Sequence, residues 1–345
     1  MYPRAVTRGP SVAALSWLSL CALYVALGVL GLVDGLWVVT PYIFALTVAR
    51  VVEPRPRLRR ALGTVAIVGG TAAVLVGVTL GIGRTPMIAV VPAETVRVAT
   101  VVGWSLAAAG ALTLACALAP VRRRLFRPLA LDPASAVHAT AAALYATTLV
   151  VMVSSFALLY DDPGETILLY LSDPAVSLLT DVPLALAGVG WLVVRNLPEA
   201  LNRLGFVPIT RRQVAWAGVV AAAFVVAAGI LDHAEAWLLP GIYAREGRFS
   251  LKFANVSPWL GAPLVALAAG VGEEAVFRGA LQPRFGVVLT ALLFAAVHVQ
   301  YEIPGIALIF LIGVTLGILR ERTSTTFTAV AHMLYDIAAF LLPDF

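Results

Sequence analysis

Residues 271–278 read Val-Gly-Glu-Glu-Ala-Val-Phe-Arg, and they place two adjacent carboxylates and an arginine inside an otherwise apolar segment. Each charge at the centre of a bilayer helix costs roughly 2.5–3.5 kcal/mol on insertion scales, so a charged cluster within such a helix indicates a functional site. A structural explanation is also open, because Glu274 and Arg278 lie four residues apart on one helical face and can neutralise each other. The choice between the two depends on what the rest of the chain brings to this segment.

The composition of the 345-residue chain, 61% hydrophobic and 12% charged, is far more apolar than that of an average soluble domain. Apolar runs long enough to cross a hydrocarbon layer of about 30 Å recur along nearly its whole length. These features predict an all-α, polytopic helical membrane protein with no segment left for a separate soluble core. We expect about eleven transmembrane helices, at residues 11–33, 36–49, 61–83, 98–119, 135–160, 174–194, 214–231, 259–281, 286–299, 304–319 and 325–342.

The arginines occur in short clusters between apolar runs, for example at residues 50–60, 122–127 and 195–212. Arginine-rich loops face the cytoplasm in membrane proteins. Placing these loops there needs no exception through the first seven crossings, and it predicts a multi-pass protein of the cell membrane with a cytoplasmic N-terminus. The net charge of +5 therefore reflects orientation signals, and we expect the lipid bilayer, not nucleic acid, as a partner.

Three regions follow from this pattern. Residues 1–231 form N-terminal membrane helices whose role stays open, residues 232–258 form a long polar extracytoplasmic loop, and residues 259–345 form the helices that carry the charged segment.

Two features of the N-terminal region stand apart from its apolar composition. Asp181 lies inside an apolar helix, where an aspartate needs a partner or water, and the sequence names no partner for it. Gly77 and Gly81 are spaced as a pair of small residues four apart, which indicates close packing between helices.

Two later helices carry histidines to the depth of the charged segment. At about 1.5 Å per residue, Glu273 lies about 15 Å below the cytoplasmic face, His298 about 20 Å, His332 about 15 Å and Asp336 about 21 Å. His332 and Asp336 are four residues apart and share a helical face. A histidine with a carboxylate one turn away can donate or accept a proton near neutral pH. The coincidence of these groups in one layer favours a functional site over a structural ion pair.

Three segments resemble the motifs of a known family. They are Glu-Glu-Ala-Val-Phe-Arg at 273–278, Phe-Ala-Ala-Val-His at 294–298 and His-Met-Leu-Tyr-Asp at 332–336. In order, spacing and membrane setting they resemble the EExxxR, FxxxH and Hxxx(N/D) motifs of the CAAX-protease and bacteriocin-processing family, also called CPBP or Abi. The resemblance covers roughly residues 259–342 and extends to the type II CAAX prenyl endopeptidases of that family. Asp336 replaces the asparagine found in many members.

The resemblance implies an intramembrane endopeptidase that hydrolyses peptide bonds near the cytoplasmic membrane face. Its substrate would be a peptide or protein, prenylated in some members. Glu273, held with His298, would activate a water molecule as a general base, because burial moves a carboxyl group towards the operating range of a base. Arg278 would pair with Glu274 and balance the charge of the two adjacent carboxylates.

His332 and Asp336 would then face the tetrahedral intermediate, with His332 as the oxyanion donor or as the acid for the leaving amine. The family is often called a metalloprotease family, and the nitrogen and oxygen atoms of Glu273, His298, His332 and Asp336 could also bind zinc. A mechanism without metal is equally compatible with these residues. We favour it, and require no cofactor, because the HExxH zinc signature is absent from the sequence.

Two other functions fit the same residues. In a proton- or ion-coupled transporter, the buried carboxylates and histidines would bind and release protons. We see no inverted repeat of the kind that many transporters contain. A catalytically silent family member, acting as a scaffold or an immunity factor, is the other alternative, and the intact motifs argue against it.

Overall fold

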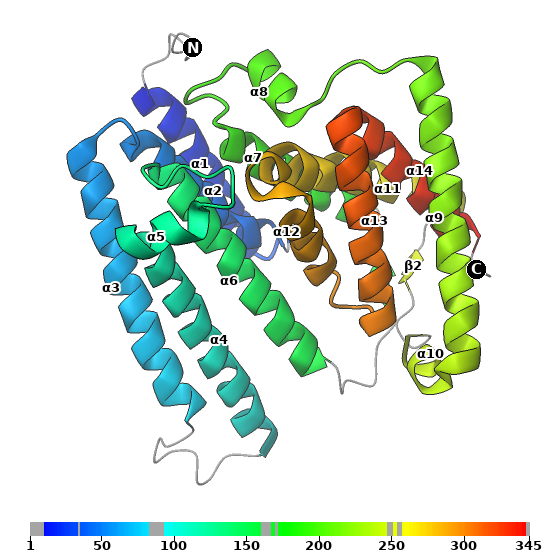
Figure 1. Ribbon diagram of the computed structural model, residues 1–345, viewed down its shortest axis with the longest axis horizontal. Helices are drawn as coiled ribbons and strands as arrows, with labels where there is room; N and C mark the ends of the chain where they lie inside the picture. The colour runs from blue at the N-terminus through cyan, green and yellow to red at the C-terminus, as the bar shows by residue number, and fades with distance from the viewer. Residues whose placement is uncertain are drawn as a thin grey trace. The chain divides into compact units, whose positions relative to one another are not determined.

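Helices make up most of the computed structural model, which describes residues 10–33, 35–82, 93–159, 167–169, 172–246, 251–253 and 257–342 (Figure 1). In this part of the chain, six helical stretches are long and apolar enough to cross a membrane, and three shorter apolar helices accompany them. The prediction of a polytopic helical membrane protein is confirmed.

The chain forms two compact units, each described here by itself. The first unit comprises Met1–Thr47, Pro163–Ala295 and Tyr301–Phe345, and the second comprises Val48–Asp162 and Ala296–Gln300. The helices of the second unit, besides the end of α2, are α3 (Pro56–Gly81), α4 (Ala93–Ala117), α5 (Ala119–Phe126) and α6 (Ala136–Leu159).

The first unit contains the charged segment. Its helices are α1 (Pro10–Val29), most of α2 (Leu36–Val52), α7 (Asp173–Val189), α8 (Leu197–Leu204), α9 (Arg211–Leu238), α10 (Pro240–Glu246), α11 (Pro258–Glu274), the π-helix η2 (Ala275–Leu281), α12 (Gln282–Ala296), α13 (Ile303–Arg322) and α14 (Thr325–Leu341). Two short strands, β1 (Ile167–Leu169) and β2 (Leu251–Phe253), pair in parallel.

Each of the eleven predicted apolar runs coincides with a helix, but several ends differ. The expected loop at 232–258 is partly helical, because α9 continues to Leu238 and α10 follows it. The continuation has a physical reason: Ala-Glu-Ala-Trp-Leu at 234–238 favours a helix, and the Glu235 side chain is buried. Residues 247–250 and 254–256 of the expected loop lie outside the described residues.

The predicted helix at 259–281 is not one regular α-helix. The α-helical pattern ends at Glu274, and the seven residues of η2 continue as a π-helix directly into α12. A backbone break follows at Gly286, with φ 78° and ψ 173°, a conformation that glycine adopts without steric cost. Single π-helical turns occur frequently at functional sites, and this one contains Arg278.

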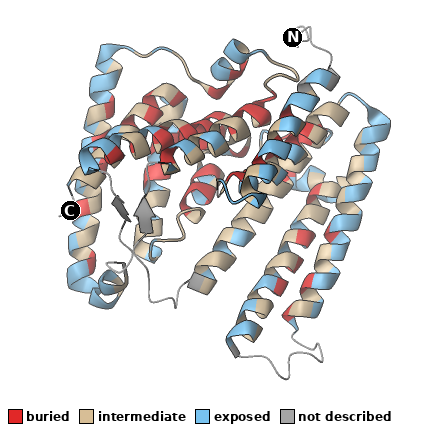
Figure 2. Cartoon of the chain, turned by 180° about the vertical axis from the view of Figure 1, so that it is seen from behind, coloured by how far each residue is buried: buried red, intermediate tan, exposed pale blue. Residues whose placement is uncertain are grey.

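Helix α11 packs between α7 and α14, and two glycines make this possible. A Cβ atom at Gly270 would lie 2.3 Å from Cγ of Met333 on α14, and one at Gly272 would lie 2.9 Å from Oδ2 of Asp181 on α7. Figure 2 shows buried residues gathered along the central helices of this unit. A helix from the N-terminal part of the chain therefore lies directly against the helix that carries Glu273.

In the second unit, α3 and α4 pack through glycines on both helices. A Cβ atom at Gly77 would lie 2.4 Å from the Ala107 backbone nitrogen, and one at Gly103 would lie 2.4 Å from the Gly81 backbone nitrogen. The close packing predicted from Gly77 and Gly81 is confirmed.

We expect Gly77→Ala to lower the free energy of unfolding by about 1–3 kcal/mol, the usual effect of overpacking a tight contact. Gly69→Ala is the matched control, since it lies on the same helix and a Cβ atom there would meet nothing within 4 Å. Unfolding of the purified protein in detergent measures both variants. Equal stability of the two would contradict this account of the α3–α4 contact.

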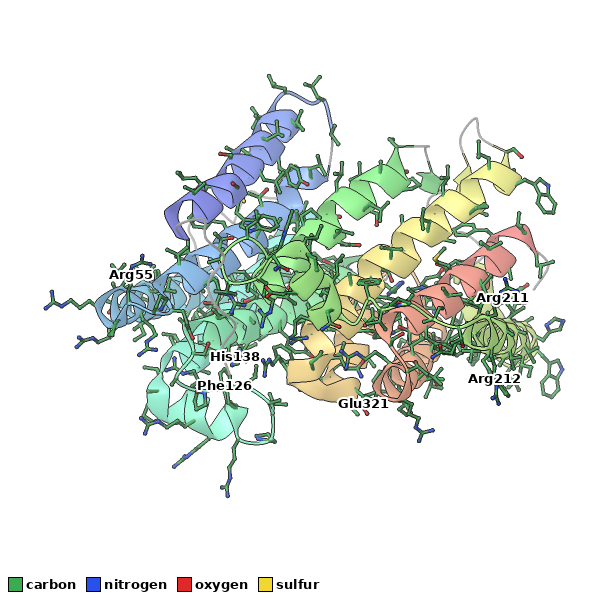
Figure 3. The ribbon with its side chains drawn as sticks, turned by 90° about the horizontal axis from the view of Figure 1, so that it is seen from above. Arg55, Phe126, His138, Arg211, Arg212 and Glu321 are labelled. Atoms are coloured by element: carbon green, nitrogen blue, oxygen red, sulfur yellow. The ribbon has the colours of Figure 1, made fainter. Side chains whose placement is uncertain are left out.

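Arginines gather at one end of each unit. In the first unit, α9 begins at Arg211 at the same end at which α13 finishes at Arg322 (Figure 1, Figure 3). In the second unit, Arg59 of α3 lies near enough to Arg122 of α5 for their charges to interact. This clustering is the pattern that orients membrane proteins, and the side of the membrane that it faces stays a prediction.

Candidate functional site

A buried ion pair lies where α11 passes into η2. Nε of Arg278 is 3.5 Å from Oε2 of Glu274, and both residues are 0% exposed. The Arg278 guanidinium also lies over the ring of Phe294 on α12, with Cζ 4.5 Å from the ring centroid. Among the described residues its nitrogens have no hydrogen-bond partner, so the carboxylate and the aromatic face are the interactions that offset its burial. The pairing expected from the sequence is present.

His332 connects this ion pair to α14. Its Nδ1 atom is 3.3 Å from Oε1 of Glu274, and its Nε2 atom is 3.5 Å from Oδ2 of Asp336. The hydroxyl group of Thr328, one turn earlier on α14, donates to the carbonyl oxygen of Thr325 and also interacts with the Glu274 carboxyl group. Only the protonated imidazole carries a proton on both nitrogens and can donate to both carboxylates at once. His332 thus links α11 to α14 through side chains 58 residues apart in the chain.

Glu273 lies beside this network. Its carboxyl group interacts electrostatically with Glu274, Arg278 and His332. Its Oε2 atom is buried, and among the described residues it has no hydrogen-bond partner. A general base needs a carboxyl oxygen that can accept a proton from water, and an oxygen without a hydrogen-bond partner meets this requirement.

Asp181 of α7 has the partners that the sequence could not name. Its Oδ2 atom lies 3.4 Å from Oγ of Ser177, and its Oδ1 atom lies 3.5 Å from Oγ1 of Thr180. Its carboxyl group also interacts electrostatically with Glu273. The isolated charge in an apolar run was the only sequence signal for Asp181, and its position beside Gly272 depends on packing.

The remaining motif residue, His298, follows the end of α12 and is half-buried. It belongs to the short segment Ala296–Gln300, which groups with the second unit. Its contact with Glu273 therefore stays a prediction, while Glu274, Arg278, His332 and Asp336 lie together in the first unit.

A zinc site needs several donor side chains that converge on one point. Within the described ranges, no group of three or more His, Cys, Asp or Glu side chains could hold a metal ion. Histidine binds zinc through a ring nitrogen that carries no proton, whereas both ring nitrogens of His332 face carboxylate oxygens. The zinc set considered from the sequence, Glu273, His298, His332 and Asp336, and the metal-free alternative both stay predictions.

The fold and the side chains together define a multi-pass membrane protein with a buried cluster of acids, an arginine and a histidine between its helices. Residues 255–338 match the family described as Rce1-like: Type II CAAX prenyl endopeptidase Rce1-like. This match spans α11 to most of α14 and contains all three motifs, and it confirms the family predicted from them. The family is one of proteases. No curated protein and no solved structure matches the chain.

Proposed function

We propose that this protein is an intramembrane endopeptidase that cleaves peptide bonds near the cytoplasmic membrane face. The observation that carries the proposal is the contact between Glu274 and His332, because it brings the first and third motifs together in the membrane interior. The family match over the same helices supports a peptidase. A C-terminal peptide with a prenylated cysteine is the substrate class that the family description suggests.

The proposed reaction begins with Glu273. Its carboxylate takes a proton from a water molecule, and the resulting hydroxide attacks the carbonyl carbon of the scissile peptide bond. The protonated His332 stabilises the oxyanion of the tetrahedral intermediate through its positive charge, or the proton on its Nε2 atom, which lies 3.5 Å from Oδ2 of Asp336, passes to the leaving amine as the C–N bond breaks. Glu274 and Asp336 hold the two ring nitrogens of His332, so its orientation is fixed before the substrate binds. Arg278 offsets the charge of Glu274.

The same proposal includes an orientation. The arginine-rich ends of α9 and α13 face the cytoplasm of the cell, and the N-terminus lies on that side. The Glu274–His332 contact is then reached from the cytoplasmic half of the membrane, the side on which a prenylated protein is anchored.

A cleavage assay with purified protein tests the function. The substrates are one peptide with a farnesylated C-terminal Cys-a-a-X sequence and the same peptide without the lipid, and mass spectrometry identifies the products. We expect one specific cleavage that Glu273→Gln removes and that a metal chelator leaves at its original rate. Loss of activity on chelation, with recovery on adding zinc, would reject the metal-free mechanism.

The transporter alternative is tested in the same preparation. Proteoliposomes that carry protons or ions without cleaving either peptide would contradict the proposed protease and support proton-coupled transport. Proton transport would use the carboxyl groups of the site, those of Asp181, Glu273, Glu274 and Asp336, so this measurement distinguishes a transporter from a protease.

A further inference from the structure

Helix α8 lies against η2, the segment that carries Arg278, although it is outside the family match over residues 255–338. A capping box defines its start, and Gly205, with φ 86°, ends it in a left-handed conformation. Its buried residues Ala200 and Leu204 belong to the same core cluster as Ala275 of η2. Both ends of α8 and its inner face are therefore held in place beside η2.

Arg203, in the last turn of α8, bonds to the backbone of η2. Its Nη1 atom donates to the carbonyl oxygen of Gly279 over 3.1 Å. The usual donor to such a carbonyl in an α-helix, the N–H four residues later, is missing, because that residue is Pro283. A buried carbonyl group needs a donor, and Arg203 supplies one from another helix. Since Gly279 directly follows Arg278, this bond holds η2 at the Glu274–Arg278 ion pair.

The same turn of α8 also bonds to the start of α14. The Leu204 carbonyl oxygen accepts a hydrogen bond of 2.6 Å from Oγ1 of Thr325, the first residue of α14. The Gly205 carbonyl oxygen accepts another, of 3.1 Å, from the Thr325 backbone nitrogen. A Cβ atom at Gly279 would lie 2.9 Å from that Leu204 oxygen, so a larger residue there would force α8 away from η2. One turn of α8 thus contacts η2 and α14 together.

These two elements carry the two sides of the candidate site. Helix α14 contributes His332, and η2 continues from Glu274, the last residue of α11. The contact of 3.3 Å between Glu274 and His332 requires that the two elements keep their separation. A displacement of about 1 Å at a reacting centre can lower a rate about 100-fold. A turn that is bonded to both elements is placed to fix this separation.

We propose that the last turn of α8 positions the candidate site, with Arg203 as the positioning residue for η2 and Thr325 as the positioning residue for the start of α14. The hydrogen bonds do not depend on any activity, and only their effect on catalysis rests on the proposed protease function. The N-terminal region, whose role the sequence left open, then sets the separation of the two elements that meet in the site.

Hydrogen exchange of the purified full-length protein, read by mass spectrometry, tests the positioning without an assay of cleavage. Arg203→Met removes the donor and keeps a long side chain, and Thr325→Val removes the hydroxyl group and keeps the branched shape. We expect exchange about 10-fold faster in residues 275–281 for the first variant and in residues 325–331 for the second. Each variant loses a hydrogen bond to a buried carbonyl group, so its segment opens more often.

Two exposed positions supply the matched controls. Arg212→Met at the start of α9 and Thr315→Val on α13 make the same substitutions at exposed side chains, and both should exchange as the wild-type protein does. Wild-type exchange in both Arg203→Met and Thr325→Val overturns the proposal. If Arg203→Met does not fold, Thr325→Val decides: faster exchange at the start of α14 supports the proposal, and wild-type exchange there overturns it.

Kinetics test the effect on catalysis. In Arg203→Met, kcat should fall about 10- to 100-fold, as expected when reacting groups are misplaced, with little change in KM. Arg203→Lys retains a charged donor and should recover part of that loss, and Arg212→Met should have the kcat of wild type. Equal kcat in Arg203→Lys and Arg203→Met would contradict a role for the donated hydrogen bond.

The two measurements distinguish failure of this proposal from failure of the proposed function. Faster exchange in the site segments of a protein that cleaves no peptide would contradict the protease and retain the positioning by α8. Cleavage with the kcat of wild type in both Arg203→Met and Thr325→Val would contradict the positioning role and retain the protease.

Discussion

Replacing Glu273 by glutamine should lower the rate of peptide cleavage by about 10²- to 10⁴-fold, the range contributed by a positioned general base. Glutamine has nearly the same shape but cannot take a proton from water. Because Glu273 lies beside the Glu274–Arg278 pair and is not part of it, the variant should fold and bind substrate normally. The expected loss therefore falls on kcat, with KM close to that of wild type.

The control and a second variant make this prediction specific. Glu321→Gln changes an exposed acid at the end of α13 (Figure 3) and should retain full activity. His298→Ala should abolish cleavage if His298 holds Glu273 as the motifs predict. Retention of activity in Glu273→Gln or in His298→Ala would refute the role assigned to that residue.

Replacing Arg278 by leucine should lower the free energy of unfolding by about 3–5 kcal/mol, because it removes the arginine that offsets the buried charge of Glu274 and leaves His332 as the partner of that carboxylate. Both residues are 0% exposed, so neither water nor a surface rotamer can offset the loss. The guanidinium also contacts the Phe294 ring, which couples α12 to η2. Chemical or thermal unfolding in detergent, followed by circular dichroism, measures the change.

Two further variants distinguish the effect of the lost charge on stability from the effect of losing a long side chain. Arg322→Leu, at the exposed end of α13, should change stability little. Adding Glu274→Gln to Arg278→Leu removes the buried carboxylate that has lost its arginine and should recover part of the lost stability. If Arg278→Leu is as stable as Arg322→Leu, or if the double variant is less stable than Arg278→Leu, the ion pair does not stabilise this fold.

The sequence predicted those contacts of the site that lie within one helix. Glu274 with Arg278 and His332 with Asp336 are each four residues apart, and any regular or nearly regular helix brings such residues together. The prediction of a common depth for Glu273 and His332 also depended only on residue counts and a topology. In the structure, His332 of α14 contacts Glu274, the residue next to Glu273 on α11.

Other features of the fold required the packed structure. Helix α8 begins with a capping box formed by Asn196 and Glu199, a signal that is readable in the sequence, but its short amphipathic pattern lies between two apolar runs and was not predicted as a helix. The π-helical turn around Arg278 has no such signal. The choice between α and π geometry depends on how the side chains around Arg278 pack.

By itself, the sequence determined the membrane class, the helical runs and the family, because hydrophobicity and residue spacing along a helix are local properties. Only the tertiary structure decided that His332 lies between two carboxylates and that Asp181 of α7 lies beside Gly272 of α11. Those contacts join residues far apart in the chain, and they exist because glycines at 270 and 272 let α14 and α7 approach α11 closely. The packing energy of such a contact depends on the shapes of both helices, and a single segment of sequence specifies one of them at most.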